Sequence, residues 1–449
     1  MTEAIEPRRA SAPAATPSFG EALRVWFKIG CLSFGGPAGQ IALMHRIIVD
    51  EKKWLDEPRF LHALNYCMVL PGPKAMQLAA YTGWLMHGIR GGLAAGLLFV
   101  IPGALVMLGL SLIYVLGGGV PVIEGALFGI KCAVLVIVVQ AIIRIGQRAL
   151  TTPLLIGLAV AAFVGIFFLQ IPFPLIVLAA AAIGFWAAPE NPHLHAVSDD
   201  SAVTAPAARE GRWRSALTVT ALWLVIWSAP VVIAVAALGR DHILVSLGVF
   251  FSKLAVVSFG GAYALMAYMT QEVVEAQRWL ALPEMVDGLG LAETTPGPLI
   301  LVTQFVGFLA AFREPAPFSP LAAAFLGAAM TTWVTFVPSF LFIFAGAPFI
   351  EDLRSNRRIA GALGAITAAV AGVIVNLALW FTLHVLFSAV REFHIGPIRL
   401  FDIGWSTLDL RAAALTIIAA ILTFVLKRGL LETIAVMAAL GIAVRLLLP

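Results

Sequence analysis

Four glycine- and proline-rich breaks interrupt apolar stretches of this sequence. They are Gly35-Gly36-Pro37, Pro71-Gly72-Pro73, Gly260-Gly261 and Pro296-Gly297-Pro298. A helix that begins at such a break exposes unpaired backbone N–H groups and the positive end of its dipole, which attract anions. Glycine lets a ligand approach the backbone, and proline fixes the turn. The breaks therefore predict an anion site, with a simple helix kink as the alternative for any one of them.

Charged side chains accompany the breaks. Lys28 and Lys253 each stand five positions before the serine that opens a glycine break, Lys74 follows the first Pro-Gly-Pro, and Glu293 precedes the second. A lysine held in an apolar region is costly and suggests a countercharge for an anion. The alternative is that the long side chain snorkels toward water. Glu293 is a carboxylate that could take up and release a proton.

Neutral polar residues lie beside the same breaks, although hydrogen bonding between helices is the simpler explanation for each one alone. Glu293 is the candidate for proton coupling. The candidate anion-binding residues are Lys28, Ser33, Gly35, Gly36, Gln40, Pro71, Gly72, Pro73, Lys74, Gln77, Ser258, Gly260, Gly261, Thr295 and Gly297.

Other chemistry has little support in the sequence. The three cysteines lie inside apolar segments without metal or redox spacing, so neither a metal site nor a cofactor is expected. No nucleophile elbow, Walker loop or zinc-binding His-Glu-x-x-His run is present, so the chain is not expected to be an enzyme. Glu124 and Lys131, seven positions apart, form a candidate ion pair on one helix face.

The chain contains an internal duplication. Three motifs return after 225 positions: 33–36 as 258–261, 54–55 as 279–280, and 71–73 as 296–298. Further on, Pro102 matches Pro338 and residues 125–127 match 361–363, now 236 positions apart. The second copy has therefore gained about eleven residues, for which Arg313–Pro320 is the natural place. Internal repeats of this kind are typical of membrane transporters.

Composition assigns the chain to the lipid bilayer. Hydrophobic residues make up 61%, charged residues 12%, and the mean hydropathy is +0.96. These values lie outside the range of soluble globular proteins. The net charge of +4 suits loops biased toward lysine and arginine and gives no reason to expect nucleic-acid binding. The polar first 19 residues show no signal peptide.

The expected fold is an all-α polytopic membrane protein with two inverted-topology repeats. About 13 hydrophobic segments are expected, four of them from the broken segments 20–48 and 58–88 and their repeats. The other expected spans are 91–116, 122–143, 152–170, 174–188, 215–239, 321–347, 359–386, 409–426 and 430–448. Each broken segment either crosses with an unwound middle or turns back as a re-entrant hairpin. Loop 45–59 is more basic than its counterpart 270–284, which favours hairpins.

The predicted organisation has five parts: a tail 1–19, a first repeat 20–188, a linker 189–214, a connecting helix 215–240 and a second repeat 241–449. One extra crossing between two even-numbered units inverts the second unit. Loop 117–121 has no lysine or arginine, whereas Arg354, Arg357 and Arg358 lie in its repeat counterpart. The positive-inside rule therefore predicts a cytoplasmic linker and N-terminus, with 117–119 outside.

Taken together, these motifs resemble the chromate ion transporter family. The resemblance rests on Phe27-Lys28, Ser33 to Pro37, Trp54-Leu55 and Leu70 to Pro73, and on their repeats, Phe259 to Gly261 and Thr295 to Pro298. It covers about residues 20–388 and corresponds to the long, two-repeat members. Ala262 replaces Pro37 in the second copy, so the two breaks need not bind anion equally. The resemblance implies a bacterial inner-membrane protein that exports chromate, with sulfate as a similar oxyanion.

The resulting hypothesis is a secondary transporter that exports chromate and confers chromate resistance, with proton coupling and a homodimer as further expectations. The alternative is a transporter or exchanger of sulfate or a related oxyanion. A membrane-embedded enzyme would need a redox or nucleophilic cluster that the sequence lacks. A purely structural membrane protein would not need lysines at matched positions in both copies.

Overall fold

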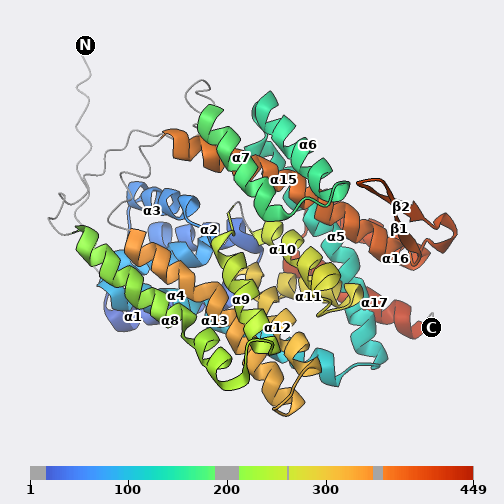
Figure 1. Ribbon diagram of the computed structural model, residues 1–449, viewed down its shortest axis with the longest axis horizontal. Helices are drawn as coiled ribbons and strands as arrows, with labels where there is room; N and C mark the ends of the chain where they lie inside the picture. Colours follow the sequence, from blue (N-terminus) through green and yellow to red (C-terminus); the bar gives the residue numbers. More distant parts are fainter. Residues whose placement is uncertain (1–16, 188–211, 260–261, 347–356, 448–449) are drawn as a thin grey trace.

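The structure is a computed structural model, and it describes residues 17–187, 212–259, 262–346 and 357–447. These residues are almost entirely helical (Figure 1), as predicted. The helices of the first copy are α1 (Phe19–Leu32), α2 (Gly36–His45), η1 (Arg46–Glu51), α3 (Glu57–Val69), α4 (Lys74–Leu116), α5 (Pro121–Ala149), α6 (Pro153–Phe167) and α7 (Phe173–Ala187). The predicted tail 1–19 and linker 189–214 fall almost wholly outside the described residues.

The second copy follows α8 (Arg212–Leu238). Its elements are α9 (Ile243–Val256), α10 (Ala262–Gln271), η3 (Glu272–Ala276), α11 (Leu282–Thr294), η4 (Leu299–Leu301), α12 (Val302–Arg313), α13 (Pro320–Gly346), α15 (Arg357–Leu386), β1 (Val390–Ile395), β2 (Ile398–Ile403), η6 (Trp405–Thr407), α16 (Leu410–Ala420), η7 (Ile421–Val425) and α17 (Leu430–Leu447). Six of the described helices, α4, α5, α8, α13, α15 and α17, are long and apolar enough to cross a membrane.

α1 and α3, which begin near the surface, are capped by side chains, whereas α2 and α4, which begin at the breaks, are not. Ser18 Oγ accepts a hydrogen bond from the Glu21 N–H (3.3 Å) at the start of α1, and Asp56 Oδ1 accepts one from the Arg59 N–H (2.9 Å) at the start of α3. Such caps satisfy N–H groups that lack a partner in the first helical turn. No side chain caps α2 or α4. Their first N–H groups therefore remain available to a ligand.

The first broken segment is a re-entrant hairpin. Lys52, just after η1, places its Nζ 2.8 Å from Glu21 Oε1 near the start of α1. The chain therefore enters through α1, turns at Ser33 to Gly35, and returns through α2 and η1 to the side from which it came. The hairpin geometry favoured by the loop charges is thus confirmed for this segment.

The second broken segment is also a hairpin. Its arms are α3 and the first part of α4, and the Tyr66 and Tyr81 ring centroids lie 4.9 Å apart between them. The chain then reverses at His87 and Gly88, which have non-helical dihedral angles, and continues as the long second part of α4. The apolar stretch 91–116 predicts a separate span. In the structure this span is the second arm of a sharply bent helix.

The second copy repeats this plan with a longer turn. Residues 314–319 join α12 to α13 where the first copy has His87 and Gly88, within the stretch assigned to the insertion. In both copies the arms beside this turn are in backbone contact. A Cβ on Gly91 would lie 2.2 Å from the Gly83 carbonyl oxygen, and one on Gly327 would lie 2.2 Å from that of Gly307.

The remaining helices are exchanged between the copies. α5 of the first copy packs against α16 and α17 of the second, and α15 of the second packs against α6 and α7 of the first (Figure 1). The contacts are close: a Cβ on Gly129 would lie 1.9 Å from the Met437 carbonyl oxygen, and one on Gly372 would lie 1.9 Å from that of Ala159. Because each copy completes the other's helical layer, the two copies form one folded unit.

The copies have opposite orientations. We call the side where α5 ends and α15 begins the arginine side, after Arg144, Arg148, Arg357 and Arg428. The opposite side, where residues 117–119 lie, is the glycine-loop side. α1 begins opposite the glycine loop, since Pro17 lies at the reversal of α4. α9 begins on the glycine-loop side, where His242 Nε2 lies 2.8 Å from the Ala316 carbonyl oxygen. The predicted inverted repeat is confirmed.

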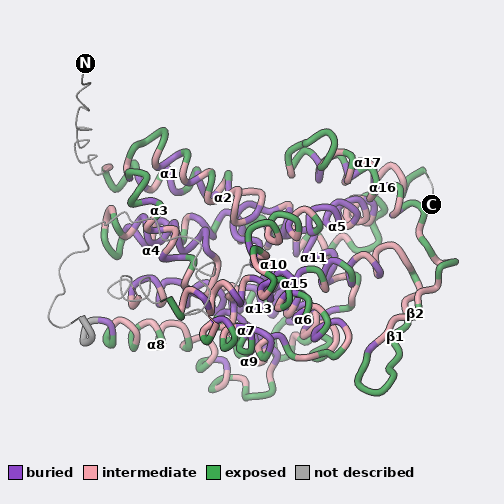
Figure 2. The backbone as a smooth tube through the Cα atoms, turned by 90° about the horizontal axis from the view of Figure 1, so that it is seen from above, coloured by how far each residue is buried: buried purple, intermediate pink, exposed green. Residues whose placement is uncertain are grey.

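α8 lies along the edge of the molecule and is largely exposed (Figure 2). It runs antiparallel to α13, to which it is joined by two reciprocal hydrogen bonds. Trp227 Nε1 donates to the Val334 carbonyl oxygen and Trp333 Nε1 to that of Ile226, each at 3.0 Å. Its exposed apolar face is consistent with contact with lipid.

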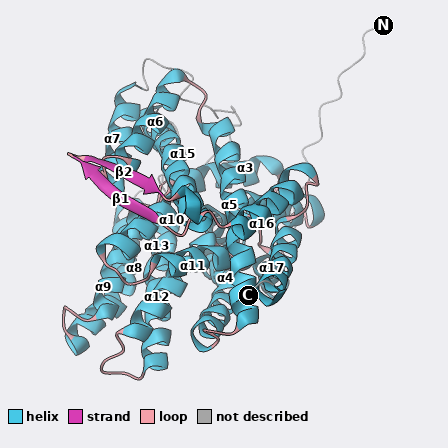
Figure 3. Cartoon of the chain, turned by 90° about the vertical axis from the view of Figure 1, so that its right-hand side faces the viewer, coloured by secondary structure: helices cyan, strands magenta, loops and turns pink. Residues whose placement is uncertain are grey.

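A β-hairpin between α15 and α16 was not predicted. β1 and β2 are antiparallel and project from the glycine-loop side (Figure 3). Ile395 pairs with Ile398, and Gly396 between them has a φ of 59°. A two-residue turn with glycine first is a recognised hairpin signal, so Gly396-Pro397 between apolar residues could have revealed it.

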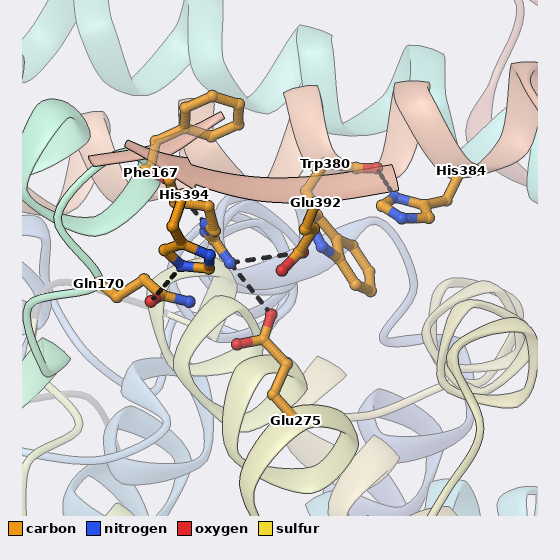
Figure 4. Close-up of polar contacts among 8 residues, drawn as sticks. Phe167, Gln170, Glu275, Trp380, His384, Glu392 and His394 are labelled. Atoms are coloured by element: carbon orange, nitrogen blue, oxygen red, sulfur yellow. Dashed lines mark hydrogen bonds and ion pairs between the residues drawn. The ribbon is translucent and has the colours of Figure 1, made fainter. Parts of the chain in front are cut away.

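Arg399 ties this hairpin to both copies. Its Nε donates to the Phe167 carbonyl oxygen at 3.0 Å, and its Nη1 lies 3.3 Å from Glu275 Oε1 and 3.7 Å from Glu392 Oε1. In Figure 4, dashed lines run from the side chains of Glu275 and Glu392 to one side chain between them. Burial raises the pKa of Glu275 above its usual value, although the charge of Arg399 opposes the shift. The hairpin thus links the α6–α7 turn to η3 outside the membrane.

Candidate functional site

The breaks of the two copies meet at the centre of the molecule. The Gly72 N–H donates to the Ser258 carbonyl oxygen at 3.1 Å, and the Gly297 N–H donates to the Ser33 carbonyl oxygen at 2.8 Å. Each residue of the first bond has its repeat counterpart in the second, 225 positions away. The second break of each copy is therefore held against the first break of the other.

This meeting point depends on glycine at two positions. Gly72 has a φ of 117°, a left-handed conformation that other residues rarely adopt. Gly103, on the second part of α4, lies so close to the opposite break that a Cβ would be 2.0 Å from the Pro296 carbonyl oxygen. A side chain at Gly103 would push the two copies apart, and one at Gly72 would strain the backbone.

A cavity of about 990 Å³ extends from these breaks toward the arginine side. Several predicted site residues line its inner part: Gly35, Gly36, Gln40, Gly72, Pro73, Lys74, Ser258 and Glu293. Arg144 and Arg148 of α5, Arg357 of α15 and Arg428 of the α16–α17 turn line it as well. The cavity thus leads from the arginine side to the starts of α2 and α4.

The cavity attracts negative charge. Five basic side chains line it, whereas Glu293 is the single carboxylate among its described lining residues. Lys74 is only 8% exposed, and its Nζ donates to the Leu70 carbonyl oxygen at the end of α3. The uncapped N-termini of α2 and α4 add the positive ends of two helix dipoles.

Glu293 and Tyr263 form a polar pair in the cavity wall. The Tyr263 hydroxyl donates to Glu293 Oε1 at 3.0 Å, and Glu293 is 3% exposed. Gln40 lies nearby, where its Nε2 donates to the Gly297 carbonyl oxygen at 2.6 Å and holds the break in place. Among the described residues, no group of three or more His, Cys, Asp or Glu side chains could hold a metal ion.

Other predicted site residues support the breaks instead of lining the cavity. The hydroxyls of Ser33 and Thr295 donate to carbonyl oxygens of their own helices, those of Ile29 at 2.6 Å and Ala292 at 2.9 Å. Gln77 is buried and donates to the Pro71 carbonyl oxygen. Pro71 and Gly297 also lie behind the cavity wall. Gly260 and Gly261 fall outside the described residues.

Lys28 does not join the other predicted residues. Its side chain is exposed on α1 and does not line the cavity, and Lys253 is likewise exposed on α9. The repeated lysines therefore match the alternative in which long side chains reach toward water along an apolar surface. We leave Lys28 out of the site considered below.

The arginines at the cavity were predicted only as markers of topology, and their contribution to the cavity was not predicted. Arg144 and Arg148 continue a helix face with Ile137 and Gln140, all of which line the cavity. Spacings of three and four residues place side chains on one helix face. That pattern was readable from the sequence, but only the fold shows that this face borders the breaks.

The predicted pairing of Lys131 with Glu124 is wrong. Lys131 Nζ lies 2.9 Å from Asp287 Oδ1 of α11, and Glu124 pairs with Arg445 of α17 at 2.6 Å. Seven residues correspond to about 10 Å along a helix, so partners on neighbouring helices are closer.

Comparison with known proteins identifies the family. The chromate transporter family model matches residues 20–185 and 245–444, one region in each copy. The chain is 31% identical over 392 residues to a chromate transport protein of Pseudomonas aeruginosa, covering 83% of this chain and 81% of that protein. It is 26% identical over 364 residues to a chromate transport protein of Cupriavidus metallidurans, covering 80% and 82%.

A shorter relative matches a single copy's worth of sequence. The uncharacterized transporter YwrB of Bacillus subtilis is 30% identical over 162 residues, which cover 35% of this chain and 81% of that protein. No solved structure matches the chain. With two matched regions, a duplicated helical membrane fold and relatives aligned over most of their length, the chain belongs to the chromate transporter family.

Proposed function

We propose that this protein is a secondary transporter that exports chromate from the cytoplasm across the bacterial inner membrane and thereby confers chromate resistance. The observation that carries the proposal is the basic cavity that ends at the uncapped N-termini of α2 and α4. A tetrahedral dianion can accept hydrogen bonds from backbone N–H groups and from Lys74 there.

The sidedness of the proposal follows from charge. Loops and helix ends on the arginine side carry Arg46, Lys52, Lys53, Arg59, Arg144, Arg148, Arg357 and Arg428. The positive-inside rule assigns such a side to the cytoplasm. The N-terminus is then cytoplasmic and the large cavity faces inward, so that its arginines can concentrate oxyanions before they reach Lys74.

Energetics favour export over import. An inside-negative potential of 100 mV drives a dianion outward with about 4.6 kcal/mol, because each charge contributes about 2.3 kcal/mol. Import would have to overcome this energy through coupling to another ion.

Glu293 is the residue through which proton binding would be coupled to anion transport. An ionised Glu293 in the cavity wall repels an oxyanion bound beside Lys74, whereas a protonated Glu293 does not. Proton binding and anion binding therefore favour each other, and the linkage is reciprocal. Transport should then depend on pH through this residue.

The test is uptake of radiolabelled chromate by inside-out vesicles, with sulfate as competitor and vesicles without the protein as blank. Accumulation that collapses with the membrane potential supports export. If chromate neither accumulates nor displaces labelled sulfate, the proposed substrate is wrong. Sulfate uptake that chromate does not inhibit would instead favour a transporter or exchanger of sulfate or a related oxyanion.

A further inference from the structure

A second, smaller cavity lies on the glycine-loop side. It measures about 470 Å³ and is bordered by residues 117–119, the beginning of α5 and part of α11. Its charged lining residues are Glu124, Lys131, Glu284, Asp287 and Arg313. α5 connects the two cavities: Lys131 borders the small one, and Ile137, six residues or about 9 Å further along the axis, borders the large one.

The two cavities are counterparts under the internal repeat. On α5 the small cavity is lined by Ile123, Glu124, Leu127 and Lys131. A shift of 236 positions gives Ile359, Ala360, Leu363 and Thr367 of α15, all of which line the large cavity. The same positions of the two copies therefore border the large cavity on the arginine side and the smaller cavity on the glycine-loop side.

On the glycine-loop side, close packing of α11 on α5 seals the path between the two cavities. A Cβ on Gly290 would lie 2.8 Å from Ile130 Cγ2 and 3.7 Å from Val134 Cγ2. The repeat counterparts of Gly290 and Ile130 are Asn65 and Ile366, and both line the large cavity. The molecule therefore has two related helix pairs, α11 with α5 and α3 with α15. In this structure the first pair is in contact and the second is separated by the large cavity.

Charged and polar side chains reinforce the seal. Lys131 Nζ lies 2.9 Å from Asp287 Oδ1, and the Tyr114 hydroxyl donates to Asp287 Oδ2 at 3.0 Å. The side chains of Lys131 and Asp287 are 22% and 7% exposed. Thr367 and His62 occupy the corresponding positions, and the uncharged Thr367 cannot take the place of Lys131 in an ion pair. Removing one partner of a buried ion pair leaves an uncompensated charge.

We propose that Lys131, Asp287 and Tyr114 form the gate on the glycine-loop side, and that Lys131 is an anion subsite which Asp287 occupies while the gate is closed. When α11 separates from α5, Lys131 loses its carboxylate partner and is free to bind an oxyanion arriving from the central site. Reclosing returns Asp287 to Lys131, and the carboxylate expels the anion by competing for the same ammonium group. The proposal rests on the anion transport proposed above.

Cysteine accessibility tests the gate without requiring transport. The reporter is Ile130→Cys, in a protein whose three native cysteines are replaced by alanine, labelled by a membrane-impermeant maleimide from the glycine-loop side. Ile130 is 8% exposed in the seal, so labelling should be slow. Asp287→Asn should accelerate it by about tenfold or more, since loss of one partner strongly destabilises the closed state. The matched control is Arg445→Gln, which breaks an exposed ion pair to the same helix, α5, and should leave the rate unchanged.

The subsite is tested in the same reporter with sulfate as the probe. In Asp287→Asn, sulfate added on the glycine-loop side should slow labelling, and the further change Lys131→Gln should abolish this protection. Equal labelling of Asp287→Asn and its parent, in protein that is monodisperse in detergent, would overturn the gate and make the ion pair a static contact. Accelerated labelling without sulfate protection would overturn the subsite. Both results are independent of chromate flux, so a failure of the proposed function remains distinguishable.

Discussion

Lys74→Ala should weaken anion binding more than any other single change in the large cavity. The ammonium group is the basic group nearest the break, its side chain is 8% exposed, and it stands at the uncapped start of α4. A hydrogen bond to a charged group contributes about 1.5–3 kcal/mol. At 1.4 kcal/mol for each tenfold change, the KM for chromate should rise by about 10- to 150-fold.

Initial rates of chromate uptake into inside-out vesicles measure this effect over a range of concentrations. Lys74→Arg, which retains the charge, should recover part of the loss, and Lys74→Met, which retains length without charge, should not. Lys28→Ala is the matched control, because Lys28 belongs to the same copy but is exposed and lies outside the cavity. Membrane expression of all four proteins is compared by immunoblot.

Two results would refute the reasoning. A KM for Lys74→Ala close to that of the parent would mean that the ammonium group does not contact the anion. An equal loss in Lys28→Ala would show that the effect of removing a lysine is not local, and the cavity would then have no special role.

Three further predictions concern pH, topology and the hairpin. Glu293→Gln, which mimics a permanently protonated side chain, should flatten the pH–rate profile of transport more than it raises the KM; an unchanged profile would remove Glu293 from proton coupling. Cysteines within 117–119 should react with impermeant reagents from outside and cysteines within 354–358 from the cytoplasm; labelling of both from one side would contradict the proposed topology. Burial raises the pKa of Glu275 above its usual 4.5, so the stability that this group contributes below pH 4.5 is lost as the pH rises through its folded value. Glu275→Gln should therefore reduce the rise in thermal stability on acidification, measured by unfolding in detergent. An unchanged dependence of stability on pH would mean that other groups cause the rise.

The sequence predicted the fold well where the signal was local or repeated. Apolar stretches predicted α5, α13, α15 and α17 to within a few residues at most ends, and the 225-residue offset predicted the duplication. The uneven charge of two short loops indicated hairpins, which a hydropathy pattern alone does not distinguish from unwound crossings. The β-hairpin escaped because its strands are six residues each and lie between long helices.

The candidate site was predicted only in part, for a physical reason. Breaks and a buried lysine are local signals, and several of the residues they indicate line the inner wall of the cavity. The arginines at its mouth come from α5, α15 and the α16–α17 turn, which meet only because the copies exchange helices. Lys28 lies away from the cavity: a repeated position indicates a repeated environment, and here that environment is an exposed helix surface in both copies.

The differences between the copies explain how an inverted repeat can acquire a direction. With two identical copies, the state open to one side and the state open to the other would have equal energy, and neither side of the membrane would be preferred. Charge-changing differences lie at the centre and at the seal: Lys74 against Leu299, Glu293 against Met68, Lys131 against Thr367, and Asp287 against His62. The first two pairs put a cation and a carboxylate near the breaks, and the last two put the Lys131–Asp287 ion pair on the glycine-loop side, where the other copy has a threonine and a histidine. The duplication thus supplies two related gaps, and in the proposed mechanism a few charged residues decide which gap an ion pair closes and which gap collects the anion.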